Sequence, residues 1–438
     1  MPELNDFLGG TGAGRSVAVD SQETVNFYPE FKDEKIILIG TPGLKPFAEL
    51  TGTGPCRGFF TSGGDRLFAV IGGSFVEILP NATMHLYGTL STTFGVVSLS
   101  ENVNLTSNTN QIMMVDKVDG YVFDLSTNTF TKITDADYQK GTHVVYKDGF
   151  FIQNVSGTNT FIFSDLYTGL SWDSLNYYAA EANSDNIEAI GKINNEIWLF
   201  GGKSVEIWYG TGDSNDPFAR VNNAFVDIGV KAKYSVAVIN NTIFWLGANG
   251  QGSNIVWMSN SYTPQRISTH SIEYTIGKMQ FTDDAIGYCY QQEGHYFYVL
   301  SFQSSNKTLI YDMSTNLWHE RGYYNSSTGN NDRHLGVCHA FWNGKNMIGD
   351  YRNGKVYFYD LDYFTDDGNI IKRWRTGPHY QKDRRRLFFR EFEINLERGV
   401  GNNNYQDIAI EPIFLGGEII EDSGSGIIEN GTIGIETN

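Results

Sequence analysis

The sequence contains few cysteines, few prolines and no long apolar run. Its 438 residues include 3 Cys and 10 Pro, and a small, odd number of cysteines predicts no disulfide framework. No stretch approaches the roughly 18 apolar residues of a membrane-spanning helix. The N-terminal segment lacks the basic and apolar regions of a signal peptide. We therefore expect a protein that is made in the cytoplasm of its host and does not insert into a membrane by itself.

Basic side chains are also in short supply. The chain has 32 Lys and Arg against 50 Asp and Glu, for a net charge of −18. Tight nucleic-acid binding needs a basic face that releases counterions, so this balance argues against it. A net negative charge suits a surface that DNA passes without binding. It is equally consistent with a charge that only keeps the protein soluble.

Glycine and aromatic residues, by contrast, are abundant. The sequence contains 48 Gly, 29 Phe and 25 Tyr. Aromatic side chains favour pleated surfaces and bury large areas, while many Gly with few Pro indicate tight turns rather than disorder. The composition therefore predicts an all-β protein.

A β-rich unit recurs about every 40–50 residues between Cys56 and Tyr380, a period typical of β-propeller blades. Each copy sets an apolar-alternating run, a polar turn, a β-branched or aromatic run, and a further turn and run. Such units must stack on neighbours, and closure into a ring removes exposed edges. Candidate blades begin near Arg57, Gly95, Thr142, Asn186, Tyr234, Ala285 and Leu335. The sequence predicts a β-propeller of about seven blades.

Three regions are expected along the chain. Residues 1–55 form an N-terminal arm with closing strands, one of which completes the last blade and spares an edge. Residues 56–380 form the propeller, and residues 381–438 form a C-terminal β extension. Helix is scarce, and its best candidate lies around Ile272–Ile276.

One motif is similar to the Asp-box of glycan-cleaving propellers. It lies at Ser164–Leu175, but Gly169 and Trp172 stand farther from Asp165 than that motif requires. We interpret it as a structural turn.

No motif predicts a catalytic, cofactor-binding or metal-binding residue. Asp360–Asn369 clusters carboxylates as a hard-cation loop does, but its Asp-Gly pair favours a hairpin. His334, Cys338 and His339 lack a second ligand pair at zinc-like spacing. The Gly-rich Gly9–Gly14 has neither the preceding strand nor the following helix of a nucleotide site.

The single dense basic segment lies at Ile371–Arg390. A solvated face and DNA phosphate contacts are alternatives, but in so acidic a chain we favour docking against an acidic neighbouring subunit or adaptor. The candidate contact residues are Lys372, Arg373, Arg375, Lys382, Arg384, Arg385, Arg386 and Arg390.

Several segments in the same order resemble one known family, the packaged-DNA stabilisation proteins of short-tailed phages, which form the tail hub or nozzle. The segments are SVAVDSQETVNFYPE (16–30), GTPGLKPFAEL (40–50), FIFSDLYTGLSWDSLNYYAAEA (161–182), EIWLFGGKSVEIWYGTG (196–212), YTPQRISTHSIEYTI (262–276), YQQEGHYFYVLSF (290–302) and NLWHERGYY (316–324).

The resemblance implies a non-enzymatic virion protein. Such proteins form a hexameric ring below the portal and its adaptor, close the DNA exit channel, and contact the needle plug and the tailspikes or fibres. The alternative is a carbohydrate-binding or carbohydrate-degrading propeller for host receptor recognition. That reading needs exposed aromatic platforms, for which the candidates are Trp198, Trp208, Trp245 and Trp257.

Overall fold

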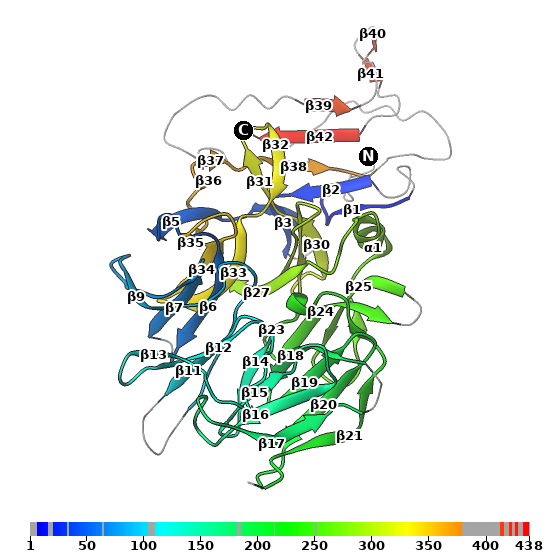
Figure 1. Ribbon diagram of the computed structural model, residues 1–438. Coiled ribbons are helices and arrows are strands. Elements are labelled where there is room, and N and C mark those ends of the chain that lie inside the picture. Colours follow the sequence, from blue (N-terminus) through cyan, green and yellow to red (C-terminus); the bar gives the residue numbers. More distant parts are fainter. Residues whose placement is uncertain are drawn as a thin grey trace.

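The computed structural model describes residues 7–15, 21–32, 35–63, 65–103, 110–181, 185–213, 215–249 and 252–378, together with the backbone of four C-terminal strands (Figure 1). Within these residues the helices are α1 (His270–Gly277) and the short 3-10 helix η1 (Lys233–Ser235). The helix expected around Ile272–Ile276 therefore lies within α1. Neither described helix has the length and apolar character that a membrane crossing needs.

Six sheets are blades of consecutive strands. The first and second blades consist of β6 (Cys56–Ser62), β7 (Arg66–Ile71), β8 (Ser74–Ile78) and β9 (Met84–Thr89), and of β10 (Ser98–Glu101), β11 (Gln111–Val115), β12 (Gly120–Asp124) and β13 (Thr129–Lys132). The third and fourth consist of β14 (Val144–Lys147), β15 (Phe150–Asn154), β16 (Thr160–Ser164) and β17 (Trp172–Ala179), and of β18 (Ile187–Ile193), β19 (Glu196–Gly201), β20 (Val205–Gly210) and β21 (Phe218–Val226). The fifth and sixth consist of β22 (Gly229–Val230), β23 (Ala237–Ile239), β24 (Thr242–Asn249), β25 (Gly252–Ser259) and β26 (Gln265–Arg266), and of β27 (Ile286–Gln292), β28 (His295–Phe302), β29 (Lys307–Asp312) and β30 (Leu317–Glu320).

A composite sheet completes the ring. Its strands are β33 (Gly336–Trp342), β34 (Lys345–Asp350), β35 (Lys355–Asp360) and, from the N-terminal arm, β5 (Gly43–Glu49). β5 runs antiparallel to β35 as its outer neighbour. The inner strands follow one another as β6, β10, β14, β18, β23 and β27, and β33 then lies beside both β27 and β6.

The all-β propeller is therefore confirmed, but within the described residues it has six blades of consecutive strands instead of the expected seven or so. Six blades form from consecutive strands, and the composite sheet takes its outer strand from a distant part of the chain. The arm thus supplies a closing strand, as the sequence analysis expects, at β5.

Tight turns between strands use residues that tolerate a left-handed backbone. Asp148 and Gly149 have φ of 50° and 97°, and Asn343 and Gly344 have φ of 48° and 71°. Two successive positive φ values define the type I′ turn, whose twist matches that of the flanking strands. The Asn, Asp and Gly in the sequence therefore fix where the strands reverse.

Apolar clusters fill the interfaces between neighbouring sheets. Phe68 and Phe75 of the first blade meet Phe123 of the second, with ring centroids 5.3 and 5.1 Å from that of Phe123. Trp198 and Trp245 are buried where the fourth blade meets the fifth. Each fully buried aromatic side chain stabilises the fold by roughly 2–3 kcal/mol through area removed from water.

Further strands lie outside the ring at one end of the molecule (Figure 1). β2 (Ser21–Val25) continues the sheet of β30 and pairs with β38 (Arg373–Thr376). β38 then pairs with β42 (Thr432–Thr437), and β42 with β39 (Pro412–Leu415). The remaining strands are β1 (Gly12–Ala13), β3 (Phe27–Lys32), β4 (Lys35–Gly40), β31 (Gly322–Asn325), β32 (Asn330–Arg333), β36 (Thr365–Asp366), β37 (Asn369–Ile370), β40 (Ile420–Asp422) and β41 (Ser425–Ile427). The domain boundaries at residues 55 and 380 stay predictions.

Candidate functional site

Polar side chains gather where the N-terminal arm meets the end of the propeller. We call this the closure region: strands β2, β3 and β5, strands β36–β38, and the loops that follow β30 and β34. It joins residues that are about 300 positions apart, such as Asn26 and Gly322, separated by 296 residues.

Asn26 joins three segments of the closure region. Its side-chain amide donates to the carbonyls of Gly322 (3.1 Å) and Lys372 (2.7 Å), and its Oδ1 accepts from the backbone N–H of Gly322 (2.9 Å). The residue is fully buried and has a φ of 56°, which Asn tolerates better than most residues. A buried amide with these partners satisfied specifies one arrangement of the three segments.

Arg375 anchors the arm from within. Its guanidinium donates to the carbonyls of Phe7 (2.6 Å) and Gly10 (2.8 Å) and to the hydroxyl of Thr24 (2.7 Å), and it also contacts Gln22. The residue is only 1% exposed. Burying a guanidinium is costly unless its donors are satisfied, and here the acceptors come from the chain's own N-terminal residues.

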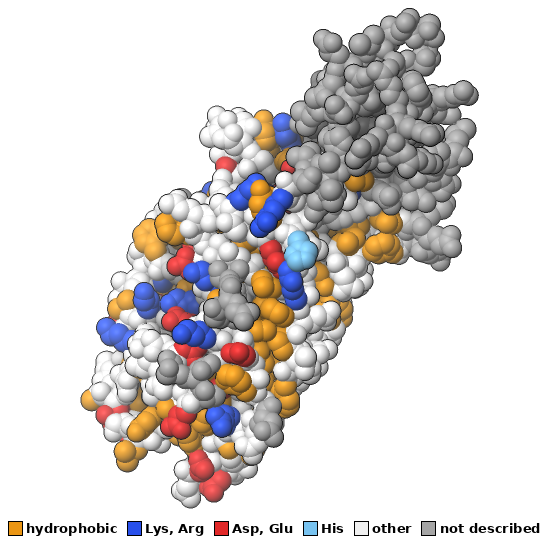
Figure 2. Space-filling view, turned by 90° about the vertical axis from the view of Figure 1, so that its right-hand side faces the viewer, with side chains coloured by type: hydrophobic (Ala, Val, Ile, Leu, Met, Phe, Trp, Pro, Cys, Tyr) orange, Lys and Arg blue, Asp and Glu red, His pale blue; other side chains and the backbone are white. Residues whose placement is uncertain are grey.

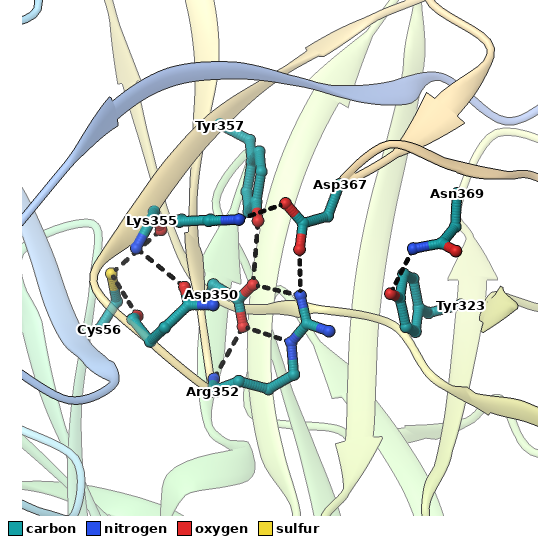
Figure 3. Close-up of polar contacts among 9 residues, drawn as sticks. Cys56, Tyr323, Asp350, Arg352, Lys355, Tyr357, Asp367 and Asn369 are labelled. Atoms are coloured by element: carbon teal, nitrogen blue, oxygen red, sulfur yellow. Dashed lines mark hydrogen bonds and ion pairs between the residues drawn. The ribbon is translucent and has the colours of Figure 1, made fainter. Parts of the chain in front are cut away.

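A network of charges links the loop after β34 to the hairpin β36–β37 (Figure 3). Asp350 accepts from Arg352 (2.9 Å) and from the hydroxyl of Tyr357 (3.0 Å). Asp367 accepts from Arg352 (2.8 Å) and Lys355 (2.8 Å). Although burial acts in the opposite direction, the hydrogen bonds from Lys355 and Arg352 lower the pKa of Asp367. The hairpin is thereby fixed to the composite sheet.

These contacts also decide the character of the acidic cluster Asp360–Asn369. Asp367 and Gly368 have φ of 49° and 80°, so the hairpin prediction is confirmed. Asp360 pairs with Lys45 (2.8 Å), and Asp366 accepts from the backbone N–H of Leu44 (2.9 Å). Within the described ranges, no three His, Cys, Asp or Glu residues form a group that holds a metal ion.

The two histidines that stand close to Cys338 in the sequence, His334 and His339, have separate partners. His334 Nε2 lies 2.9 Å from the hydroxyl of Tyr359, and His339 Nε2 lies 2.9 Å from Oδ1 of Asn346. Burial lowers the pKa of His334 well below its ordinary value and that of His339 to about 4. Both histidines are therefore neutral packing residues at pH 7.

The structure describes three of the candidate contact residues. Lys372 Nζ lies 4.1 Å from the ring centroid of Tyr324. Arg373 donates to the carbonyl of Thr41 (2.9 Å), and burial lowers its pKa. Arg373 and Arg375 thus bind the chain's own arm, and Arg375 is buried against it. The remaining candidates lie outside the described residues: Lys382, Arg384, Arg385, Arg386 and Arg390.

Sequence reasoning missed Asn26, Arg352 and Asp367 as joining residues. Asn26 lies within one of the segments that carry the family resemblance (16–30), and Asp367 lies within the acidic cluster Asp360–Asn369, whereas no motif included Arg352. The partners of Asn26 lie near the other end of the chain, and no local periodicity reveals them.

The four Trp side chains that the carbohydrate alternative requires on the surface pack in or against the cores between blades. Trp198, Trp208 and Trp245 are buried in the cores between blades, and Trp257 packs against one of these cores. A hollow of about 340 Å³ beside Tyr262 has Glu196 as its single acidic lining residue. Glycoside hydrolysis normally needs two carboxylates, so neither observation favours the carbohydrate alternative.

Among the described residues that face the viewer in Figure 2, Lys and Arg form no continuous stripe. Acidic and basic side chains are interspersed on this face, with hydrophobic side chains between them. A nucleic-acid interface concentrates Lys and Arg on one face.

Comparison with solved structures finds matches of low similarity. The extracellular domain of a one component system from B. thetaiotaomicron is 8% identical, with a TM-score of 0.47; the match covers 72% of this chain and 40% of that one. Virginiamycin B lyase from Staphylococcus aureus is 10% identical, with a TM-score of 0.47, and the match covers 72% of this chain and 98% of the lyase. The computationally designed Ika8 protein is 9% identical, with a TM-score of 0.38 and coverages of 72% and 99%.

No curated protein matches the chain in sequence. A family match, in contrast, extends over residues 21–363, from β2 to the end of the composite sheet and beyond. On this match the chain belongs to the phage stabilisation family described as the Bacteriophage P22 Gp10 β-propeller.

Proposed function

We propose that this chain is a structural subunit of a phage tail that forms a ring below the portal and its adaptor. The ring closes the DNA exit channel, stabilises the packaged DNA and releases it during ejection. The observation that carries the proposal is the extent of the family match, since residues 21–363 include all six blades of consecutive strands and the composite sheet. The location is then the virion, after assembly in the host cytoplasm.

The construction of the propeller suits a wall that must resist load. Strand β5 closes the ring of sheets with a ladder that runs from Lys355 opposite Glu49 to Asp360 opposite Gly43. To open the ring, this ladder and the apolar contacts on both sides of the composite sheet must break together. A subunit closed in this way keeps its shape while pressure acts on the assembly.

The charge of the chain supports passage of DNA without capture. With a net charge of −18, a ring of several copies repels phosphates at distances up to about the Debye length of 8–10 Å. The mechanism is thus steric and electrostatic and uses no cofactor and no catalytic group. The chain assembles with other copies of itself into a ring of six subunits in all. Its other partners are the adaptor and portal, the tailspike or fibre, and the needle plug.

The native mass of the purified chain, with and without the purified adaptor ring, tests this proposal. Light scattering gives the mass directly. We expect a monomer or weak oligomer alone and a particle with six added copies on the adaptor. A stable trimer that ignores the adaptor would favour a receptor-binding role instead.

A further inference from the structure

The blade β14–β17 displays a concentration of exposed apolar side chains. Leu166, Leu170, Leu175 and Tyr177 are 51%, 38%, 80% and 52% exposed and lie within one short segment. We call these four residues the β17 surface. Single exposed apolar residues are ordinary on a protein, whereas several on one short segment make that segment a candidate interaction site.

The loop that carries the β17 surface is held in one conformation. Asp165 accepts from the Ser171 hydroxyl (2.5 Å), and its backbone N–H donates to the Ser171 carbonyl (2.9 Å). The indole of the buried Trp172 donates to the carbonyl of Gly169 (2.9 Å). The segment that is similar to an Asp-box is therefore a rigid support, which lowers the entropic cost of binding a partner.

Leu175 projects from a bulge at the outer edge of the blade. Ser164 stands opposite Trp172 and Ile162 opposite Tyr177, so four residues of β17 face one residue of β16. Asp173 Oδ1 accepts from the Leu175 backbone N–H (2.9 Å) and fixes the bulge. Edge strands are usually protected by charge or by Lys and Pro, whereas this edge presents its most exposed apolar side chain.

Three acidic groups bind strand β17 close to the β17 surface. Asp173 lies within it, Asp135 accepts from the backbone N–H of Trp172 (3.1 Å), and Asp216 accepts from the hydroxyl of Tyr178 (2.5 Å). The sequence from residue 164 to residue 181 contains no Lys or Arg. The surface therefore fits a partner that combines apolar and basic side chains.

One segment of the same chain has this composition. Residues 384–390 read RRRLFFR, with four Arg and three large apolar residues, and they follow β38 by fewer than ten residues. We propose that residues 384–390 of one copy bind the β17 surface of a second copy. The inference rests on the proposed function, because it names the contact between ring subunits.

The position of β38, the described strand that precedes the basic segment, favours contact between copies over contact within one chain. β17 and β38 lie at opposite ends of the molecule (Figure 1). A contact that joins two unlike surfaces repeats head to tail, and it closes into a ring when the rotation between copies allows it. In this proposal the basic segment is a contact between subunits, and the β17 surface of the neighbouring copy is its binding site.

A pair of variants tests the acceptor side. Leu175→Ser with Tyr177→Ser removes the most exposed apolar groups, and we expect ring assembly on the purified adaptor, followed by sedimentation, to weaken about tenfold. Leu86→Ser is the matched control, since Leu86 is 54% exposed on the edge strand β9 of another blade and its loss leaves association unchanged. Equal effects of both variants would overturn the proposal.

Charge exchange tests the donor side. Arg384→Glu with Arg385→Glu and Arg386→Glu weakens association, and adding Asp173→Arg to the partner copy restores part of it. Circular dichroism confirms that each variant is folded. Absence of rescue, together with salt-independent association, would contradict the charge pairing.

A photo-cross-linking residue in place of Leu175 separates this inference from the proposed function. Cross-linking of the assembled full chain, followed by mass spectrometry, identifies the peptide in contact. A cross-link to the peptide that holds residues 384–390 supports the inference. If the ring forms but the cross-link lies elsewhere, the inference fails and the proposed function stands. If no assembly forms alone or on the adaptor, both fail.

Discussion

The interface between the fourth and fifth blades and the closure region hold the same ring together by different means. The blade interface consists of apolar side chains from neighbouring strands, including Trp198, Phe200 and Trp245. The closure region relies on buried polar groups such as Asn26 and Arg375, whose partners lie hundreds of residues away. Packing between blades thus supplies most of the stability, while directional hydrogen bonds decide which distant segments meet.

Removal of a central blade side chain should have the largest effect. Trp245→Ala leaves a cavity in a fully buried cluster, and we expect a loss of about 3–5 kcal/mol in the free energy of unfolding. Chemical denaturation followed by fluorescence and circular dichroism measures it. Phe341→Ala, at an exposed position, serves as control and should stay within about 0.5 kcal/mol. Similar losses for both would contradict the assignment of stability to the blade interfaces.

Acid should destabilise the fold through buried histidine. His319 is fully buried, and burial lowers its pKa from 6.5 to about 3. The unfolded chain therefore binds a proton below pH 6.5 that the folded chain does not, so stability falls as the pH decreases from 6.5 towards 3. The loss from this residue is about 3 kcal/mol at pH 4, since each pKa unit is worth about 1.4 kcal/mol.

Replacement of this residue sharpens the test. Both ring nitrogens of His319 lack a hydrogen-bond partner, so His319→Phe should flatten the dependence of stability on pH between 6.5 and 4. His270→Phe, at a highly exposed position, is the control. His295 acts in the opposite sense, because its hydrogen bond to Asp312 raises its pKa; that contribution is lost as the pH rises through the raised value. An unchanged pH profile in His319→Phe would refute the account.

Loss of Arg375 should loosen the arm and leave the blades intact. Arg375→Met leaves buried carbonyl acceptors without a donor, at about 2–3 kcal/mol. Hydrogen exchange should then rise in β2 and in residues 7–13, with no change in β19 or β24. Arg375→Lys should rescue only part of the effect, because an ammonium group does not reproduce the guanidinium fork. Faster exchange throughout the ring would show that the arm and the blades unfold as one unit.

A smaller effect is expected at the hairpin β36–β37. Asp367→Asn removes the charge that pairs with Arg352 and Lys355, and we expect a loss of about 1 kcal/mol for this partly exposed network. The loss should shrink at high salt, where exposed charges are screened. Thermal unfolding at two salt concentrations measures it, and an effect independent of salt would point to packing instead.

The same contrast explains what sequence reasoning could predict. The propeller could be inferred because each blade sets short apolar, β-branched and aromatic runs, such as Phe150–Asn154 and Glu196–Gly201, between tight turns such as Asp148–Gly149. The closure region could not, because the partners of Asn26 and Arg375 are set by the closed ring and not by local pattern. Arg375 in particular sits in a dense basic segment that reads as surface, yet its guanidinium binds the chain's own N-terminal residues. The number of blades was mispredicted for the same reason, because β5 pairs with β35, a strand about 300 residues away in the sequence.

The most direct test of the central claim is electron cryo-microscopy of the tail of virions that contain this chain. The account predicts propeller density repeated around the DNA channel below the adaptor, with one subunit's β17 edge facing the next subunit. Tails that lack this density, or that carry the propeller only at the fibres, would contradict it.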